Sequence, residues 1–202
     1  MTIQNAIIAA AIGCTLLATS NLSAQANDSS AASRPESRWG LMLNSGTLVP
    51  TGAQRDVIKR GSVSAAQLTY ALTPAFAITS TAGWARSKDV SIADDPKLDV
   101  FTYDVGVEFR APRWTMGKSV TFAPFAGAGA GGRSYNYRKL DVDATHNAAA
   151  YGSIGGEIGV GRARVRLEAR DYAAGFKPLL AGGPARTSND VVVMAGLRFA
   201  SR

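Results

Sequence analysis

Charged side chains at alternating positions are the richest source of possible chemistry in this sequence. Arg164, Arg166, Glu168 and Arg170 occupy every second position, so an extended strand would place all four on one face. Carboxylate and guanidinium groups on such a face can pair with each other or, if water reaches them, line a path for ions. We expect this face to continue on neighbouring segments, in a set made of Glu108, Arg110, Glu157, Arg164, Arg166, Glu168, Arg170 and Arg198.

A hydrolase of the Ser-His-carboxylate type needs a histidine beside a serine. His146 is the single histidine of the chain, and it follows Asp141 and Asp143 in a polar stretch. The sequence shows no serine paired with it on a strand. We therefore interpret His146 as a solvated loop residue and expect no catalytic residues.

Metal and cofactor sites are not indicated either. Asp89, Asp94 and Asp95 could hold calcium, but they lack the ordered ligand spacing of an EF-hand, which favours a solvated acidic loop. One histidine and one cysteine make a zinc site improbable. The glycine-rich run 126–131 has no following Lys-Ser/Thr and leads into no helix, unlike a phosphate-binding loop. We expect no metal and no cofactor.

The elements that position the charged face are expected to be strands. From Arg38 onward, segments of about ten residues alternate between apolar and polar side chains, as in membrane barrels. Over 98–111, Phe101, Tyr103 and Val105 share one face, while Asp104 and Glu108 share the other. The pattern predicts eight strands, at 39–48, 62–72, 76–86, 98–111, 119–134, 148–160, 163–173 and 190–199.

The connections between these strands alternate strictly between long and short. The long ones are 48–61, 87–97, 135–147 and 174–189, and the short ones are 73–75, 112–118 and 161–162. An up-and-down membrane barrel has short periplasmic turns and long external loops, whereas a Greek-key sandwich has no reason to alternate. We predict an all-β fold, an eight-stranded antiparallel up-and-down transmembrane β-barrel.

The N-terminal 26 residues have the layout of a secretory signal peptide. An apolar stretch at 6–18 is followed by Ala24, Gln25 and Ala26, an A-x-A cleavage site. The apolar stretch is shorter than the roughly 20 residues of a spanning helix. An uncleaved anchor and a lipoprotein modified at Cys14 are the alternatives. We expect residues 1–26 to be a signal peptide, 27–37 a flexible leader and 38–202 the barrel domain.

The net charge of +7 raises the question of which kind of anionic partner the protein meets. The basic residues are spread along strands and loops, without a basic helix or a nucleic-acid motif. Anionic lipid or lipopolysaccharide accounts for the charge at least as well, and we expect no nucleic-acid partner.

Several segments resemble the outer-membrane β-barrel family, whose eight-stranded members include OmpA-like, OmpW-like and OmpX-like proteins. The resemblance extends over about residues 38–199, and the segments are 49–52, 123–131, 155–159, 166–172 and 195–199. It implies a monomer in the outer membrane of a Gram-negative cell, folded by the barrel-assembly machinery. That machinery reads a terminal aromatic residue, and here Phe199 is followed by three further residues.

Together these features favour a structural, envelope-integrity or surface-interaction role, with a lumen plugged by the charged face. A lipid A-modifying outer-membrane enzyme, a soluble lipocalin-type ligand-binding barrel and a small porin-like channel are the alternatives. The expected partners are outer-membrane lipid, lipopolysaccharide and the assembly machinery. The soluble alternative requires Phe101, Tyr103, Val105 and Phe109 to point into the barrel.

Overall fold

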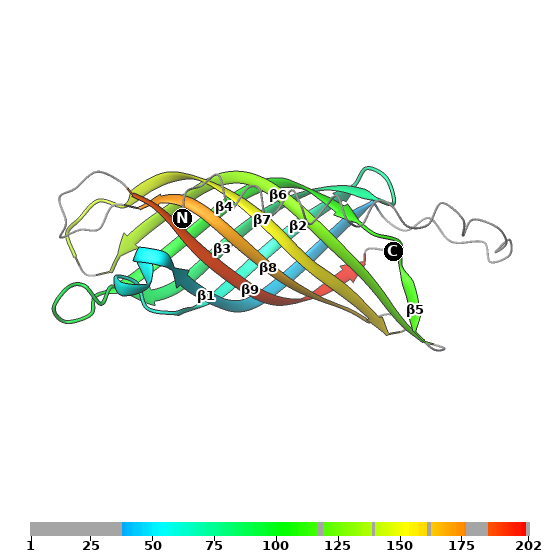
Figure 1. Ribbon diagram of the computed structural model, residues 1–202, viewed down its shortest axis with the longest axis horizontal. Coiled ribbons are helices and arrows are strands. Elements are labelled where there is room, and N and C mark those ends of the chain that lie inside the picture. The colour runs from blue at the N-terminus through cyan, green and yellow to red at the C-terminus, as the bar shows by residue number, and fades with distance from the viewer. Residues whose placement is uncertain (1–37, 117–118, 139, 161–162, 177–185, 201–202) are drawn as a thin grey trace, which may run out of the picture. The chain divides into compact units, whose positions relative to one another are not determined.

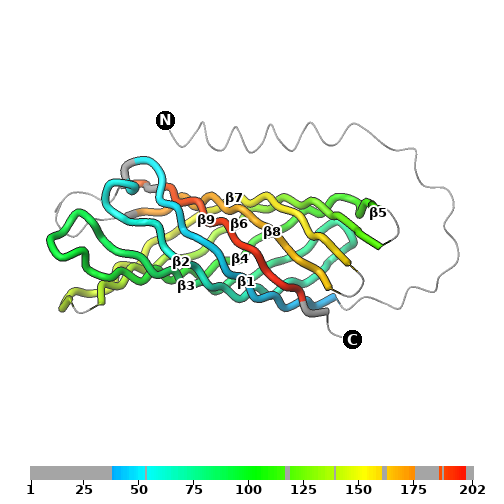
Figure 2. Tube along the Cα trace, turned by 90° about the horizontal axis from the view of Figure 1, so that it is seen from below, coloured from blue at the N-terminus to red at the C-terminus, as the bar shows by residue number. Residues whose placement is uncertain are grey.

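The computed structural model describes residues 38–116, 119–138, 140–160, 163–176 and 186–200, and the predictions made for residues 1–37 lie outside this range. The strands form one antiparallel sheet that is closed by pairing between its first and last members (Figures 1 and 2). Their bounds are β1 (Trp39–Thr51), β2 (Gly61–Ala71), β3 (Phe76–Lys88), β4 (Lys97–Arg110), β5 (Trp114–Met116), β6 (Val120–Tyr137), β7 (Thr145–Val160), β8 (Ala163–Phe176) and β9 (Arg186–Ala200).

The barrel wall consists of eight long strands, as predicted. β4 pairs directly with β6, so the three-residue β5 extends the sheet only at the edge of β6. β5 lies within the predicted turn 112–118 and was not expected. Each remaining strand pairs with its neighbours in the chain, which is the up-and-down topology.

Several strands extend further than predicted at the end with the long connections. β6 continues to Tyr137, β7 already begins at Thr145, and β1 pairs with β9 as far as Thr51 opposite Asn189. Backbone pairing continues there although the apolar alternation has faded, so the sequence pattern underestimates these hairpins. A 3-10 helix, η1 (Gly52–Asp56), follows β1 at the same end (Figure 1). The described residues include no helix with the length and apolarity of a membrane span.

The apolar faces of the strands point outward. On β4, Tyr103, Val105, Val107 and Phe109 are 45–60% exposed, while Asp104 between them is buried. This facing excludes the soluble alternative. The same arrangement around the wall defines an apolar belt, made of Leu41, Leu43, Leu68, Ile78, Tyr103, Val105, Val107, Ile154, Leu167, Val193 and Leu197.

Aromatic pairs border the apolar belt, as in membrane barrels. At the short-turn end Trp39 packs on Tyr70 and Phe76 on Phe109, with ring centroids 4.7 and 5.4 Å apart. At the other end Trp84 stacks on Phe101 at 6.3 Å. Tyr135 and Tyr137, near the end of β6, do not belong to these pairs, because both are buried inside the barrel.

Candidate functional site

The inward faces of β4, β7, β8 and β9 bring the predicted charged residues into the lumen. Arg166 and Arg170 on β8 have side chains that are only 1% exposed, and Glu168 between them is 3% exposed. Successive side chains of a strand point to opposite faces, so these three share the inward face while Val165 and Leu167 point out of the barrel. Such buried charges are tolerated only when they are paired.

Arg166 is the centre of the ion pairs. Its Nη2 donates to Glu108 Oε2 on β4 at 2.5 Å, and its Nε donates to Glu168 Oε2 at 2.9 Å. Its Nη1 lies 3.6 Å from Glu157 Oε1 on β7. The guanidinium also lies over the Phe125 ring, 3.4 Å from the centroid. One arginine thus links three strands across the lumen to its own.

Arg170 extends the network toward the middle of the barrel. Its Nε donates to the second oxygen of Glu168 at 2.5 Å, so this carboxylate bridges two arginines. Its Nη1 donates to Asp104 Oδ1 at 3.0 Å, and the Tyr172 hydroxyl donates to the other oxygen of Asp104 at 2.8 Å. The Arg170 guanidinium lies 4.7 Å from the ring centroid of Tyr151.

Two further arginines close the network at the short-turn end. Arg110 Nε donates to Glu108 Oε1 at 2.7 Å, and Arg198 Nη1 donates to both oxygens of Glu157 at 3.1 and 3.2 Å. Arg164 lies on the same inward phase of β8, opposite Arg198, and is half-buried. We call this set the interior network: Asp104, Glu108, Arg110, Glu157, Arg166, Glu168, Arg170, Tyr172 and Arg198.

Three charged residues outside the predicted set also lie inside the barrel: Asp104, Arg133 and Asp190. Asp104 belongs to the interior network, and Arg133 on β6 forms a buried ion pair with Asp190 on β9. Arg133 also lies over Tyr172, 4.7 Å from the ring centroid. All three follow the inward phase of the predicted strands, so the alternation itself was the signal that could have found them.

The glycines of β6 and β7 make room for aromatic rings. A methyl group at Gly155 would overlap the Phe125 ring, and one at Gly129 would lie 2.6 Å from Cε1 of Tyr151. These two rings then carry Arg166 and Arg170 on their faces. The glycines therefore act on the arginines through the rings.

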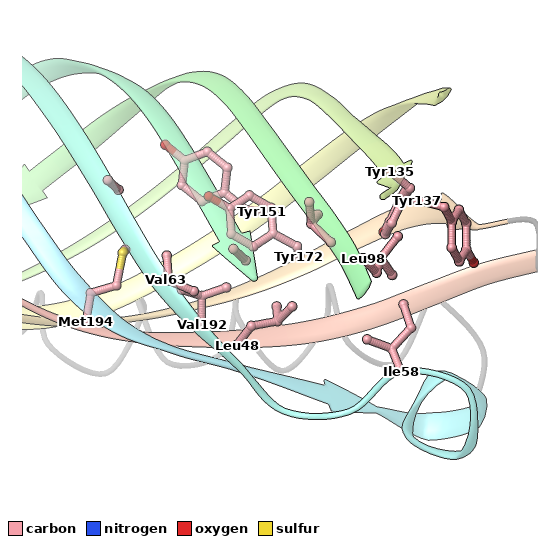
Figure 3. Close-up of a cluster of buried hydrophobic side chains, with 13 residues drawn as sticks. Leu48, Ile58, Val63, Leu98, Tyr135, Tyr137, Tyr151, Tyr172, Val192 and Met194 are labelled. Carbon is pink, nitrogen blue, oxygen red and sulfur yellow. The ribbon is translucent and has the colours of Figure 1, made fainter. Parts of the chain in front are cut away.

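The lumen near the long connections is filled by an apolar cluster (Figure 3). Ile58, from the segment after η1, is 1% exposed and packs with Leu48, Leu98 and Tyr137. A β-bridge joins Ile58 to Asp89, whose carboxylate accepts a 2.7 Å hydrogen bond from the Tyr137 hydroxyl. Two of the long connections are thus joined to each other and to β6 at this end of the barrel.

A cavity bounded by Thr81, Arg133 and Met194 measures about 20 Å³, which is room for about one water molecule. Gln67 on β2 is also fully buried.

The other candidate residues lie on or near the barrel surface. His146 is exposed on β7 rather than in a loop, and its register partner is Ser134 on β6. The expectation that no strand serine lies beside it is therefore wrong. No hydrogen bond joins the two side chains in the part of the chain that the structure describes.

The acidic stretch does not gather into a metal site. Asp89 is buried and held by Tyr137 and by the Ser91 hydroxyl, which donates at 2.6 Å. Asp94 and Asp95 are exposed at the tip of the same hairpin, both with positive φ. Among the described residues no group of three His, Cys, Asp or Glu side chains could hold a metal ion.

Outside the apolar belt, Asp99 forms a surface ion pair at the end with the long connections. Arg138 Nε and Nη2 each donate to one oxygen of Asp99, both at 2.6 Å. These hydrogen bonds lower the pKa of the Asp99 carboxyl and raise the pKa of the Arg138 guanidinium. The pair fixes the end of β6 to the start of β4.

Comparison with known proteins identifies the fold. No family model and no curated protein sequence matches the chain. The crystal structure of Neisserial surface protein A (NspA) is similar, with a TM-score of 0.56 and 10% identity, covering 83% of this chain and all of that one. The outer membrane protein OprG from Pseudomonas aeruginosa has a TM-score of 0.53 and 11% identity, covering 82% and 98%. The chain has the eight-stranded fold of the outer-membrane β-barrel proteins.

Proposed function

We propose that this protein is an integral outer-membrane barrel with a closed lumen, whose role is structural or interactive rather than conductive or catalytic. The apolar belt and its bordering aromatic pairs support insertion in a bilayer. The short turns would then face the periplasm and the long connections the outside. A monomer suffices, because the sheet closes on itself without a second copy.

The side chains packed in the lumen are the observation that best supports a barrel closed to ions. The interior network joins residues of four strands by side chains, and the apolar cluster with Ile58 covers the other end. Small eight-stranded barrels have interiors only wide enough for side chains. Ions would have to displace both buried ion pairs and packed apolar groups, so we propose a plug rather than a pore or gate.

Planar-bilayer recording tests this proposal. We expect the refolded protein to give no steady channels at any voltage that the bilayer tolerates. A matched pair of variants locates the seal: Arg166→Ala with Arg170→Ala removes the long side chains of the interior network, whereas Arg38→Ala with Arg55→Ala removes two exposed arginines. Steady single-channel openings of the unchanged protein would contradict the proposal, and ion leakage confined to the first double variant would support it.

The register pair of Ser134 and His146 is the one observation that favours a second candidate, a lipid A-modifying enzyme. Ser134 is the register partner of Phe101 on β4 and of His146 near the start of β7, and its side chain is buried whereas that of His146 is exposed. The carboxylate nearest along β4, Asp99, is already occupied by Arg138. The pair thus lacks the third group that would orient the histidine, and we retain the non-enzymatic proposal.

A further inference from the structure

Four basic side chains form a row across the outward face of the barrel, at the end with the long connections. Lys88 ends β3 and is the direct register partner of Lys97, which begins β4. The Arg138 amide donates to the Lys97 carbonyl at 2.9 Å, which places Arg138 next in the row. On the other side, the Lys59 amide donates to the Lys88 carbonyl at 3.0 Å and holds Arg60 beside β3. We call Arg60, Lys88, Lys97 and Arg138 the basic row.

Three members of the basic row, Arg60, Lys88 and Lys97, carry positive charges that no ion pair among the described residues compensates. Like charges directly opposite each other on neighbouring strands are destabilising, yet Lys88 and Lys97 occupy such positions. In the described part of the chain no carboxylate forms an ion pair with Arg60, Lys88 or Lys97, and Asp99 pairs with Arg138 alone. An anion from outside the chain would remove this repulsion.

Arg86 and Trp84 mark the depth of the basic row in the membrane. Arg86 lies on β3 two residues before Lys88, and its guanidinium is 3.9 Å from the centroid of the Trp84 ring. Trp84 in turn stacks on Phe101 with an interplanar angle of 4°. Tryptophan is enriched at the membrane–water boundary, so the basic row lies just on the water side of that boundary.

A hollow in the apolar belt lies below the basic row. It is a shallow, open depression of about 530 Å³. Small outward residues on β2 and β3 form its floor and larger side chains form its walls, the lining including Ser64, Ala66, Ala82, Leu43, Trp84, Phe101 and Tyr103. On β3 the six residues from Ala82 to Lys88 separate the hollow from the basic row by roughly 15 Å along the membrane normal for a tilted strand.

We propose that the basic row and the hollow together bind one bisphosphorylated glycolipid of the lipid A type. This inference rests on the proposed function, which turns the long connections toward the outer leaflet. The phosphates would contact the basic row, and one acyl chain would fill the hollow. The row crosses three strand spacings, roughly 14 Å, so it suits two separated phosphates better than the single phosphate of a phospholipid. A second copy is a poorer occupant, because a two-fold contact would bring two basic rows together.

Lipid binding by the full chain, folded in detergent micelles, tests the proposal. The probes are bisphosphoryl lipid A, monophosphoryl lipid A and phosphatidylglycerol, with bound lipid measured by native mass spectrometry. The variant Lys88→Gln with Lys97→Gln removes the repelling pair. Arg38→Gln with Arg55→Gln is the control with equal loss of charge, since both arginines are exposed and outside the basic row. Ala82→Phe fills the hollow without a change of charge.

The proposal predicts that bisphosphoryl lipid A binds more tightly than either other lipid. At about 1 kcal/mol for each basic residue near an anionic surface, the lysine variant should lose about 30-fold in affinity, while the arginine control keeps the affinity of the unchanged protein. Ala82→Phe should weaken binding of the acylated lipid with the basic row intact. Equal losses in both charge variants, equal binding of phosphatidylglycerol, or a dimer that persists with lipid A would overturn it. Selective binding by a protein that conducts would contradict only the proposed function.

Discussion

Arg166→Met tests the interior network most sharply. The substitution keeps a long side chain over Phe125 but removes the charge that holds Glu108 and Glu168, whose side chains are both 3% exposed. Breaking a buried pair by removing one partner costs about 3–5 kcal/mol, because the remaining charge stays buried without compensation. Arg110 and Arg170 still pair with these carboxylates, so we expect the lower end, about 3 kcal/mol.

The assay is reversible urea unfolding in phospholipid vesicles, followed by tryptophan fluorescence. Arg55→Met is the control, an exposed arginine of η1 whose loss should cost less than about 0.5 kcal/mol. The double variant Glu108→Gln with Arg166→Met should lose about 1–3 kcal/mol less than the sum of its single variants, because the two groups are in contact. A loss below about 1 kcal/mol for Arg166→Met, or strict additivity in the double variant, would refute the reasoning about buried pairing.

Three further predictions follow from local geometry. The pKa of Asp99 is lowered in the folded barrel, so its contribution to stability is present above the unfolded pKa of about 3.9 and is lost as the pH falls through the lower native value. The urea midpoints at pH 5 and pH 3 should therefore differ less in Asp99→Asn than in the unchanged protein. Gly155→Ala should cost about 1–3 kcal/mol from overlap with a neighbouring carbonyl and ring, whereas Gly152→Ala, which has open space, should fold normally by heat-modified gel mobility. Lipid A from cells producing the protein should have the same mass spectrum as lipid A from cells producing Ser134→Ala, and a mass difference between them would favour the enzyme.

The fold could be predicted because period-2 alternation and loop lengths are properties of local sequence. Glu108 and Arg166 were assigned to the lumen from their phase alone, and the structure places both there. The phase of the alternation indicates which face of the strand a side chain occupies, but it does not indicate which side chains of other strands that residue contacts. The partners of Arg166 depend on strand stagger around the closed wall, which a single strand does not encode.

The remaining differences have similar physical causes. Ile58 enters the barrel from a segment without alternation, since its position depends on the bridge to Asp89 in a second connection. Ser134 and His146 became neighbours because β6 and β7 pair beyond the predicted strand ends. In both cases the decisive contacts join two segments whose sequences give no local signal for each other.

The facing of β4 is the most direct test of the membrane barrel. A nitroxide attached at Val107→Cys, where the native side chain is 60% exposed, reports its surroundings in vesicles by electron paramagnetic resonance. Asp95→Cys, an exposed position at the tip of the hairpin between β3 and β4, is the reference. We predict that the label at 107 is accessible to oxygen and protected from a water-soluble nickel complex, with the opposite order at 95. Access of the nickel complex to the label at 107 would contradict insertion of the apolar belt in the bilayer.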